Sequence, residues 1–209
     1  PNTSSVSPGE CNLKLREQLE KSGVKFRFDC RVVGYEGNAI KTTNGSFSAD
    51  HVYNCAGLYA DKVAHLFGSG REYTLLPFKG VYRKCIGDNP VNRHIYPVPN
   101  LANPFLGVHF TQTVKGESKI GPTAIPAFWR EHYDGLSGFD LMEFAQVSLC
   151  ELDLLIRNSF GFRSLALQEI VKYRASALEK DAGNMLNKFT SKTKAMPAGI
   201  RAQLLNIKT

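Results

Sequence analysis

The first part of the chain has apolar positions spaced as in a helix. Between residues 10 and 22, Leu13, Leu15 and Leu19 lie among charged residues, and Gly23 follows at the point where a helix would end. We therefore predict one amphipathic helix in this segment.

Short strands are predicted after this helix. Val24 to Phe28 alternates apolar and basic side chains, as a strand with one buried face does. The segments 31–35, 38–43 and 46–48 also resemble strands, and Gly37-Asn38 and Asn44-Gly45 are typical hairpin turns between them. This pattern predicts a small antiparallel meander.

A strand, a turn and a helix are predicted next. His51 to Ala56 reads as a buried strand, Leu58 to Phe67 as a helix, and Gly57 lies at the junction. A strand, a tight turn and a helix in this order form the unit found in nucleotide-binding sheets.

A second region begins near Leu76, where the pattern becomes that of a mainly antiparallel sheet. Successive strands with no helix between them favour antiparallel pairing. The predicted strands are 78–86, 93–97, 105–113 and 117–121, followed by a helical region from 138 to 188 and a last strand at 200–207. The fold class expected is α+β combined with α/β: a partial Rossmann-like domain, and a domain whose antiparallel sheet is covered by helices.

Charge narrows the classes of partner only slightly. The chain has 26 Lys and Arg against 19 Asp and Glu, a net charge of +7. Such an excess suits nucleic acid, an anionic membrane surface or an acidic small molecule, and equally a basic surface without a partner. Because the basic residues are scattered, with no run of five like charges, the pattern argues against nucleic acid.

The cysteines indicate a reducing compartment and no metal site. The five are Cys11, Cys30, Cys55, Cys85 and Cys150, widely spaced and without a CxxC pair. No signal segment is evident, and no stretch approaches the roughly 18 apolar residues of a membrane span. We expect a cytoplasmic protein, with peripheral attachment to the inner membrane left open.

The usual phosphate-binding loop of dinucleotide-binding proteins is missing. Gly68-Ser69-Gly70 follows a predicted helix and has no third glycine at the GxGxxG spacing. Asn54 to Asp61, with Cys55, Ala56 and Gly57, nevertheless resembles the second flavin-contacting stretch of the FAD enzymes related to D-amino-acid oxidase. Small residues let a backbone approach a ligand closely, although Gly57 would equally suit a tight turn alone.

A series of further short sequence motifs, here called words, resembles motifs of the L-2-hydroxyglutarate oxidase and dehydrogenase family. They follow the family's order and approximate spacing over nearly the whole chain. In that resemblance, Val32 would contact the adenosine half of FAD through its backbone, and Lys79 replaces an Arg. The words are Leu76-Pro77-Phe78-Lys79-Gly80-Val81-Tyr82, His94-Ile95-Tyr96-Pro97-Val98-Pro99, Pro104-Phe105-Leu106-Gly107-Val108-His109-Phe110-Thr111, Gly121-Pro122-Thr123-Ala124, Ala127-Phe128-Trp129-Arg130-Glu131 and Pro197-Ala198-Gly199-Ile200-Arg201-Ala202-Gln203.

Two residues in these words suit the chemistry that the resemblance implies. Strand alternation places His109 on a face with small groups, opposite Val108 and Phe110, where an imidazole could take the proton of a substrate hydroxyl. Arg201 could hold a carboxylate through two parallel hydrogen bonds. The alternative for His109 is a structural role, with its hydrogen bonds satisfied within the fold or at the surface. The alternative for Arg201 is a surface ion pair.

Three other side chains complete the predicted substrate-binding set. Tyr82 and Tyr96 could each donate a hydroxyl into the pocket, although tyrosine on a half-buried strand often only packs. Lys79 keeps the positive charge of the family's Arg but loses its planar fork. The cofactor-binding set is Val32, Cys55, Ala56 and Gly57, and no metal ligand is predicted.

The resemblance implies an FAD enzyme that oxidises L-2-hydroxyglutarate, a dicarboxylate, to 2-oxoglutarate, with oxygen or a quinone as electron acceptor. Residues 1–75 would be part of the FAD-binding domain, 76–195 the substrate domain and 196–209 a strand returning to the first domain. The rivals are a related oxidase of amines, amino acids or glycerol phosphate, and a non-catalytic remnant or basic binding module. A glycine-rich loop encoded upstream of Pro1 would separate the enzyme from the remnant.

We expect the 209-residue chain to bind FAD weakly or not at all, because the family's glycine loop and later flavin contacts are missing from it. A fluorescence titration of FAD with the purified chain measures this. Tight, saturable binding would contradict the interpretation of the chain as an internal piece.

Overall fold

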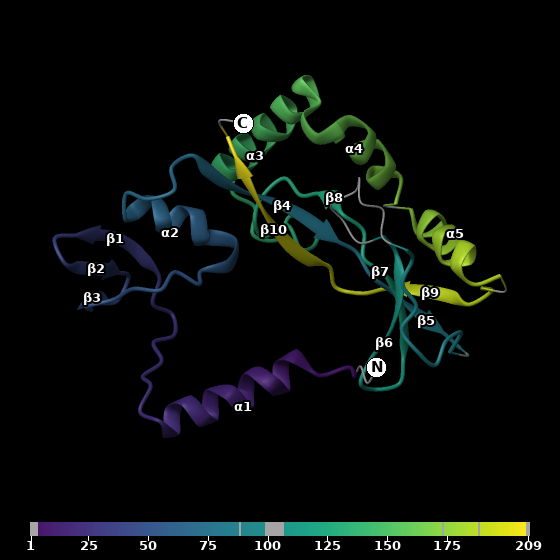
Figure 1. The fold of residues 1–209 in the computed structure, drawn as a ribbon, viewed down its shortest axis with the longest axis horizontal. Helices are drawn as coiled ribbons and strands as arrows, with labels where there is room; N and C mark the ends of the chain where they lie inside the picture. The colour runs from purple at the N-terminus through teal and green to yellow at the C-terminus, as the bar shows by residue number, and fades with distance from the viewer. Residues whose placement is uncertain (1–3, 88, 99–106, 173, 188, 208–209) are drawn as a thin grey trace. The chain divides into compact units, whose positions relative to one another are not determined.

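The structure is a computed structural model that describes residues 4–87, 89–98, 107–172, 174–187 and 189–207 (Figure 1). Its internal contacts divide the chain into two compact units. We call Val6–Leu75 with Ala202–Thr209 the N-terminal unit, and Leu76–Arg201 with Pro1–Ser5 the central unit.

The N-terminal unit begins with the predicted helix, α1 (Pro8–Lys21). Ser7 caps it, since the Ser7 hydroxyl accepts a hydrogen bond from the Glu10 amide at 3.4 Å, and Pro8 occupies the first turn, where no amide donor is needed. No residue of α1 is buried. The helix therefore depends on its caps and on charge pairs such as Lys14 with Glu17 rather than on packing.

The predicted meander is present in the same unit. Strands β1 (Val32–Glu36), β2 (Ala39–Thr42) and β3 (Gly45–Ser48) pair antiparallel in chain order. The 3-10 turn η1 (Gly57–Tyr59) and helix α2 (Ala60–Leu66) follow. The ring of Tyr35 in β1 stacks on Phe67 at the end of α2, with ring centroids 4.3 Å apart.

Two predicted strands of this unit are absent. Val24 to Phe28 and His51 to Ala56 have no regular structure and are exposed. Neither segment pairs with another strand among the described residues. Alternation alone does not make a strand, because the backbone amides and carbonyls of a strand must pair with a neighbour.

The other two sheets contain the remaining strands, most of them in the central unit. One sheet has the order β10-β4-β8, and the other has the order β6-β7-β5-β9 with antiparallel pairs throughout. Their bounds are β4 (Tyr73–Gly80), β5 (Arg83–Ile86), β6 (His109–Gln112), β7 (Ser118–Gly121), β8 (Ile125–Pro126), β9 (Lys192–Ala195) and β10 (Gly199–Asn206).

The structure corrects the predicted bounds of three strands. The segment 78–86 is interrupted at residues 81 and 82, because β4 and β5 belong to different sheets. Of 93–97, only Ile95 pairs, in an isolated bridge to Phe110. The strand predicted over 105–113 is observed as β6, while Phe105 and Leu106 lie outside the described residues.

Helices make up the rest of the central unit, as the pattern between 138 and 188 predicts. They are α3 (Leu141–Arg157), η2 (Ser159–Gly161), α4 (Phe162–Val171) and α5 (Ala175–Met185). The protein is thus a mixed α/β protein with antiparallel sheets and helices, which confirms the predicted class. No helix formed by the described residues is long and apolar enough to cross a membrane.

One core cluster of the central unit lies between α5 and one face of the four-stranded sheet. The helix contributes Leu178 and Ala182, and the partly buried Met185 packs against them. The sheet side of the cluster consists of Cys85, Val108, Phe110 and Ile120, joined by Val91. Because these side chains use one face of the sheet, the polar side chains of alternate residues lie on the other.

A buried carboxyl group lies on α3. Glu151 is 6 % exposed, and its Oε1 has no hydrogen-bond partner among the described residues. Burial raises the pKa of Glu151 from 4.5 to about 8, so the carboxyl is largely protonated in the folded protein at neutral pH.

We expect Glu151→Gln to stabilise the protein increasingly as pH rises. The folded pKa is above the unfolded one, so the wild-type stability from this group is complete below pH 4.5 and is lost as pH rises through about 8. The difference in unfolding free energy between variant and wild type should grow by roughly 3–5 kcal/mol between pH 5 and 9. Urea denaturation at several pH values measures it.

The matched control is Asp153→Asn, which removes an exposed carboxylate from the same helix. Because this carboxylate is exposed, its variant should differ from wild type by an amount that stays constant over the same pH range. A pH-independent difference for Glu151→Gln as well would contradict the protonated state of this carboxyl.

Candidate functional site

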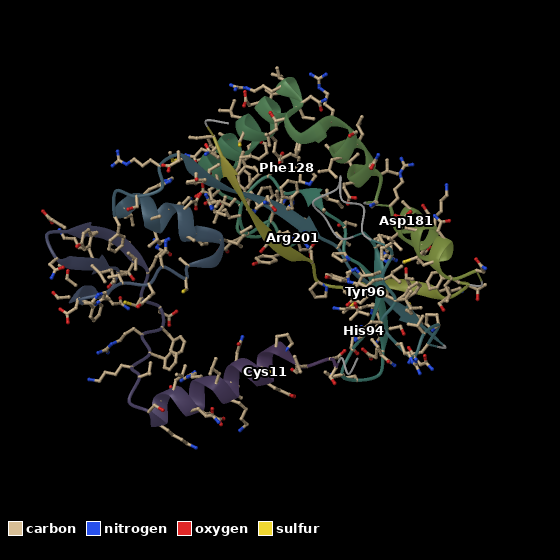
Figure 2. All side chains as sticks on the ribbon, in the orientation of Figure 1. Cys11, His94, Tyr96, Phe128, Asp181 and Arg201 are labelled. Atoms are coloured by element: carbon tan, nitrogen blue, oxygen red, sulfur yellow. The ribbon has the colours of Figure 1, made fainter. Side chains whose placement is uncertain are left out.

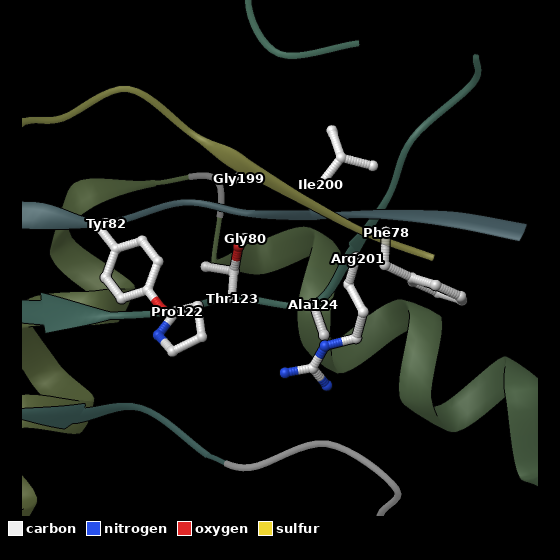
Figure 3. A pocket seen from close by; sticks show the side chains of 9 residues that line it. All are labelled: Phe78, Gly80, Tyr82, Pro122, Thr123, Ala124, Gly199, Ile200 and Arg201. Carbon is white, nitrogen blue, oxygen red and sulfur yellow. The ribbon is translucent and has the colours of Figure 1, made fainter. Parts of the chain in front are cut away.

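Three segments far apart in the sequence converge on one pocket of the central unit. They are the end of β4 with the residues after it, the connection from β7 to β8, and the start of β10. The pocket has a volume of about 180 Å³, below the roughly 300–1,000 Å³ of pockets for drug-sized ligands. Its lining, shown in Figure 3, consists of Phe78, Gly80, Tyr82, Pro122, Thr123, Ala124, Gly199, Ile200 and Arg201.

Close backbone packing holds the pocket wall in place. A Cβ on Gly80 would lie 3.2 Å from the Cβ of Pro122, so glycine allows the two segments to approach. The Thr123 hydroxyl accepts a hydrogen bond from the Val81 amide at 2.9 Å and donates one to the Lys79 carbonyl at 3.0 Å. The wall therefore owes its position mainly to the backbone.

Helix α4 fixes the same wall from behind. The buried carboxylate of Glu169 accepts a hydrogen bond from the Ala124 amide at 2.7 Å. Its other oxygen pairs with the Lys172 ammonium at 2.5 Å. The Glu169 carboxylate thus takes the place of a strand partner for the Ala124 amide in the pocket wall.

Arg201 and Tyr82 bring positive charge and a hydroxyl to the pocket. In Figure 3 the Arg201 side chain runs past Ala124, and the Tyr82 hydroxyl lies beside Pro122. Burial raises the pKa of Tyr82, while the charge of Arg201 lowers it and Tyr96 raises it further. The phenol is therefore protonated at neutral pH and can donate a hydrogen bond.

His109 lies on the sheet face opposite the core, as strand alternation predicts. Its neighbours Val108 and Phe110 belong to the core cluster, and its cross-strand partner on β7 is Gly121. A Cβ on Gly121 would lie 2.7 Å from the Val81 carbonyl oxygen and 2.9 Å from Cδ1 of Tyr82. Glycine at 121 thus makes room for Tyr82 next to the strand that carries His109.

The surroundings of His109 favour a neutral ring that carries its proton on Nδ1. The imidazole is 7 % exposed, and its Nδ1 lies 3.0 Å from the Gly107 carbonyl oxygen. Because a carbonyl only accepts, Nδ1 carries the proton and Nε2 keeps the lone pair. Burial lowers the pKa of His109 below 6.5; the hydrogen bond to Gly107 opposes this, and Lys119 and His94 add to it.

Tyr96 packs against His109, with ring centroids 4.6 Å apart. His94 lies beside Tyr96, 6.2 Å between centroids, and both are labelled in Figure 2. The His94 Nδ1 accepts a hydrogen bond from the Gln112 amide at 3.4 Å, and its Nε2 lies 3.2 Å from the Ser5 hydroxyl. The fold thus brings Tyr82, Tyr96 and His109 together. Tyr82 also lines the pocket with Arg201, whereas Tyr96 and His109 are not among the residues that line it.

Lys119 is a neighbour of this group that the sequence pattern did not single out. It pairs with Thr111 across β6 and β7, and its Nζ lies 4.3 Å from the ring centroid of Tyr82. Alternation within 117–121 places Lys119 on the face of Gly121, but the register that sets it near Tyr82 depends on the pairing of β5, β6 and β7.

Lys79 does not line the pocket. Its neighbours Phe78 and Gly80 do, so alternation along β4 turns Lys79 to the other side. Burial lowers the pKa of Lys79, and Asp134 opposes that shift. Lys79 in turn adds to the lowering of the pKa of His132, which burial mainly causes. The buried lysine thus lies within electrostatic range of Asp134 and His132, in the loop after Arg130, rather than in the pocket.

The predicted cofactor-binding residues lie in the N-terminal unit. Val32 begins β1 and is half-buried, whereas Cys55, Ala56 and Gly57 are exposed. Gly57 has φ +55°, and no atom outside its neighbours lies within 4 Å of the position of a Cβ. An accessible turn of small residues fits close contact with part of a flavin nucleotide.

Asn54 holds that turn from both sides. Its Oδ1 accepts a hydrogen bond from the Ala56 amide at 3.2 Å, and its Nδ2 donates to the Ala60 carbonyl at 2.7 Å. The turn and His109 belong to different units, so a cavity shared by Gly57 and His109 stays a prediction.

Comparisons with known proteins give relatives that include L-2-hydroxyglutarate dehydrogenases. The L-2-hydroxyglutarate dehydrogenase, mitochondrial, of Caenorhabditis briggsae is 31 % identical over 224 residues, which is 99 % of this chain and 50 % of the relative. The L-2-hydroxyglutarate dehydrogenase of Indibacter alkaliphilus is 46 % identical over 140 residues, 64 % of this chain and 35 % of the relative. The chain thus spans about half the length of the first relative, and its match to the second covers 35 % of that protein.

A solved structure and a family profile complete the comparison. Glycine oxidase from Geobacillus kaustophilus superposes with a TM-score of 0.44 at 16 % identity, covering 83 % of this chain and 36 % of that one. The profile of the FAD dependent oxidoreductases, DAO, matches residues 1–191. Because that match takes in most of the chain, the chain belongs to the DAO family of FAD-dependent oxidoreductases.

Proposed function

We propose that this chain supplies the substrate-binding part of an FAD-dependent enzyme that oxidises L-2-hydroxyglutarate to 2-oxoglutarate. One observation carries the proposal: Arg201 and Tyr82 line one pocket, and Tyr82 lies against Gly121, the cross-strand partner of His109. The names of the relatives, which are L-2-hydroxyglutarate dehydrogenases, support this choice of substrate.

The pocket chemistry suits a small acid. Arg201 offers a planar fork that can hold one carboxylate through two hydrogen bonds, and the Tyr82 hydroxyl can donate a further one. A volume of about 180 Å³ suits a compact acid rather than a large ligand. Arg201 and Tyr82 would orient the substrate by one end.

His109 is the proposed base. Its Nε2 would accept the proton of the substrate hydroxyl while the hydrogen on the same carbon leaves as hydride. FAD, when bound, would supply the hydride acceptor. The Gly107 carbonyl fixes the tautomer, because it holds the Nδ1 proton and orients the ring.

The division of labour follows the chain. Residues 1–75 would contribute flavin contacts through Val32, Cys55, Ala56 and Gly57, residues 76–195 would hold the substrate, and 196–209 would return toward the flavin domain with Arg201. Oxygen or a quinone would reoxidise the flavin. A reducing, cytoplasmic setting agrees with five cysteines that form no disulfide.

We expect His109 to titrate below 6.5, because burial and Lys119 both oppose its protonated form. Replacing Lys119→Met removes a positive charge and should move the pKa of His109 up toward 6.5. NMR titration of the imidazole signals measures the pKa of His109 in the wild type and in Lys119→Met. The signal that is lost in His109→Gln is the signal of His109. Lys115→Met, in the exposed turn before β7, is the control that should leave the pKa unchanged.

A His109 pKa at or above 6.5 in the wild-type protein would contradict a neutral base at this site. An equal effect of Lys119→Met and Lys115→Met would show that net charge, rather than the position of Lys119, sets the pKa.

We expect L-2-hydroxyglutarate to reduce the flavin of the FAD-loaded protein produced from its complete gene, measured as loss of oxidised-flavin absorbance without oxygen. Arg201→Gln should raise the half-saturating concentration about 10- to 100-fold, as loss of a charged hydrogen bond of about 1.5–3 kcal/mol predicts. His109→Gln should instead lower the rate at saturation. Arg174→Gln, an exposed arginine outside the pocket, is the matched control.

Faster flavin reduction by glycine, sarcosine or glycerol 3-phosphate than by the hydroxy diacid would assign the protein to one of the related oxidases. No reduction by any of these compounds would favour a non-catalytic remnant. An Arg201→Gln variant that behaves as wild type would exclude the pocket as the carboxylate site.

A further inference from the structure

Helix α3 exposes an apolar stripe with coiled-coil spacing. Met142, Ala145, Leu149, Leu152 and Ile156 follow one another at intervals of three, four, three and four residues. All five are exposed, Met142 at 73 %, Leu149 at 67 % and Ile156 at 64 %. This is the heptad spacing with which one helix packs against another. We call these five residues the α3 seam.

The seam lies on the side of α3 that faces away from the protein. The buried residues of the helix are Glu143, Val147, Glu151 and Leu154. At 100° per residue, the centre of the seam is roughly 180° from the centre of this buried set. The stripe is therefore not the edge of the core but a second apolar face, separate from the side of α3 that packs on the central unit.

Helix α4 also exposes apolar side chains. Leu167, Ile170 and Val171 are each more than half exposed. They are candidates to extend a contact beyond the seam, since each partner of a standard-size interface buries about 800 Å². Single exposed leucines need no explanation, but five exposed apolar side chains along one helix face do.

We propose that the α3 seam is the contact with a second copy of this chain, with the two α3 helices antiparallel about a twofold axis at Leu149. This arrangement places Met142 against Ile156 of the copy, Leu149 against its own counterpart, and Ala145 within one residue of the register of Leu152. The apolar side chains of the seam thus meet those of the same patch on the copy, as an interface related by a twofold axis requires. The proposal is independent of the proposed function.

Charges at the helix ends agree with antiparallel pairing. Asp140 caps the start of α3, and the exposed Arg157 is its last residue, held by Asp153 at 2.7 Å. In an antiparallel pair, Asp140 of one copy lies near Arg157 of the other, and the helix dipoles also oppose each other favourably. In a parallel pair, Asp140 would lie near Asp140 of the copy and Arg157 near Arg157, so like charges would meet at both helix ends.

The flanks of the seam favour a protein partner over a lipid surface. Gln146 and Asp153 are exposed beside the seam, at positions that border the opposing helix in a coiled coil. An interfacial helix in a membrane carries mainly Lys and Arg there. On this flank the residues are instead an amide and a carboxylate, and on the other flank they are Leu141, Ser148 and Leu155.

Sedimentation equilibrium of the whole chain tests the proposal. The wild type should be a dimer, and Leu149→Arg should raise the dimer dissociation constant at least 100-fold, because the symmetry places two charges together at the axis. Leu15→Arg, in the exposed helix α1, is the matched control and should stay dimeric. Circular dichroism and thermal unfolding check that Leu149→Arg is folded.

A charge exchange tests the antiparallel geometry separately. Met142→Glu and Ile156→Arg should each weaken the dimer, whereas the double variant should recover it, because position 142 of one copy then meets position 156 of the other with opposite charge. Failure of the double variant to recover would overturn the antiparallel arrangement, since a parallel pair joins like charges at both positions.

A monomeric wild type would overturn the proposal. Flotation with vesicles of phosphatidylcholine and phosphatidylglycerol is the second measurement. If the wild type is monomeric and Leu149→Arg abolishes vesicle binding, the seam is a lipid contact instead. A dimer that Leu149→Arg leaves intact would place the interface elsewhere and equally overturn the proposal.

Discussion

The central unit depends on the close approach of the chain after β4 to the chain after β7. Two glycines make the approach possible. At Gly121 a Cβ would lie 2.7 Å from the Val81 carbonyl oxygen, and at Gly80 it would lie 3.2 Å from Pro122. Thr123 then joins the two segments by hydrogen bonds to backbone groups at residues 79 and 81. The positions of Tyr82 and the pocket follow from this contact.

The four-stranded sheet separates stability from chemistry by its two faces. One face packs Phe110 and Ile120 against α5, while the other carries His109 and Lys119. Because adjacent residues of a strand point to opposite faces, a strand as short as β6 can serve both purposes. Burial and nearby positive charge lower the pKa of His109, and the same positive charge suits an anionic ligand.

Helix α3 reverses the usual distribution of side chains. Its buried face includes Glu143, which pairs with Arg130 at 3.4 Å, and Glu151, whose Oε1 has no partner among the described residues. Its exposed face carries the α3 seam. Burying carboxyl groups and exposing leucines both oppose folding of a lone copy. A helix of this kind is better explained by two contacts, one with its own unit and one outside it.

The sequence by itself determined the elements that local signals define: the capped helix α1, the meander with its glycine turns, the helical region after residue 138 and the face of His109. Only the tertiary structure decided the rest. Val24 to Phe28 alternates but has no partner strand, Lys79 turns away from the pocket, and Lys119 reaches Tyr82 through the register of three strands. Caps, turns and alternation act within a few residues, whereas pairing and register depend on backbone groups that meet only when distant segments fold together.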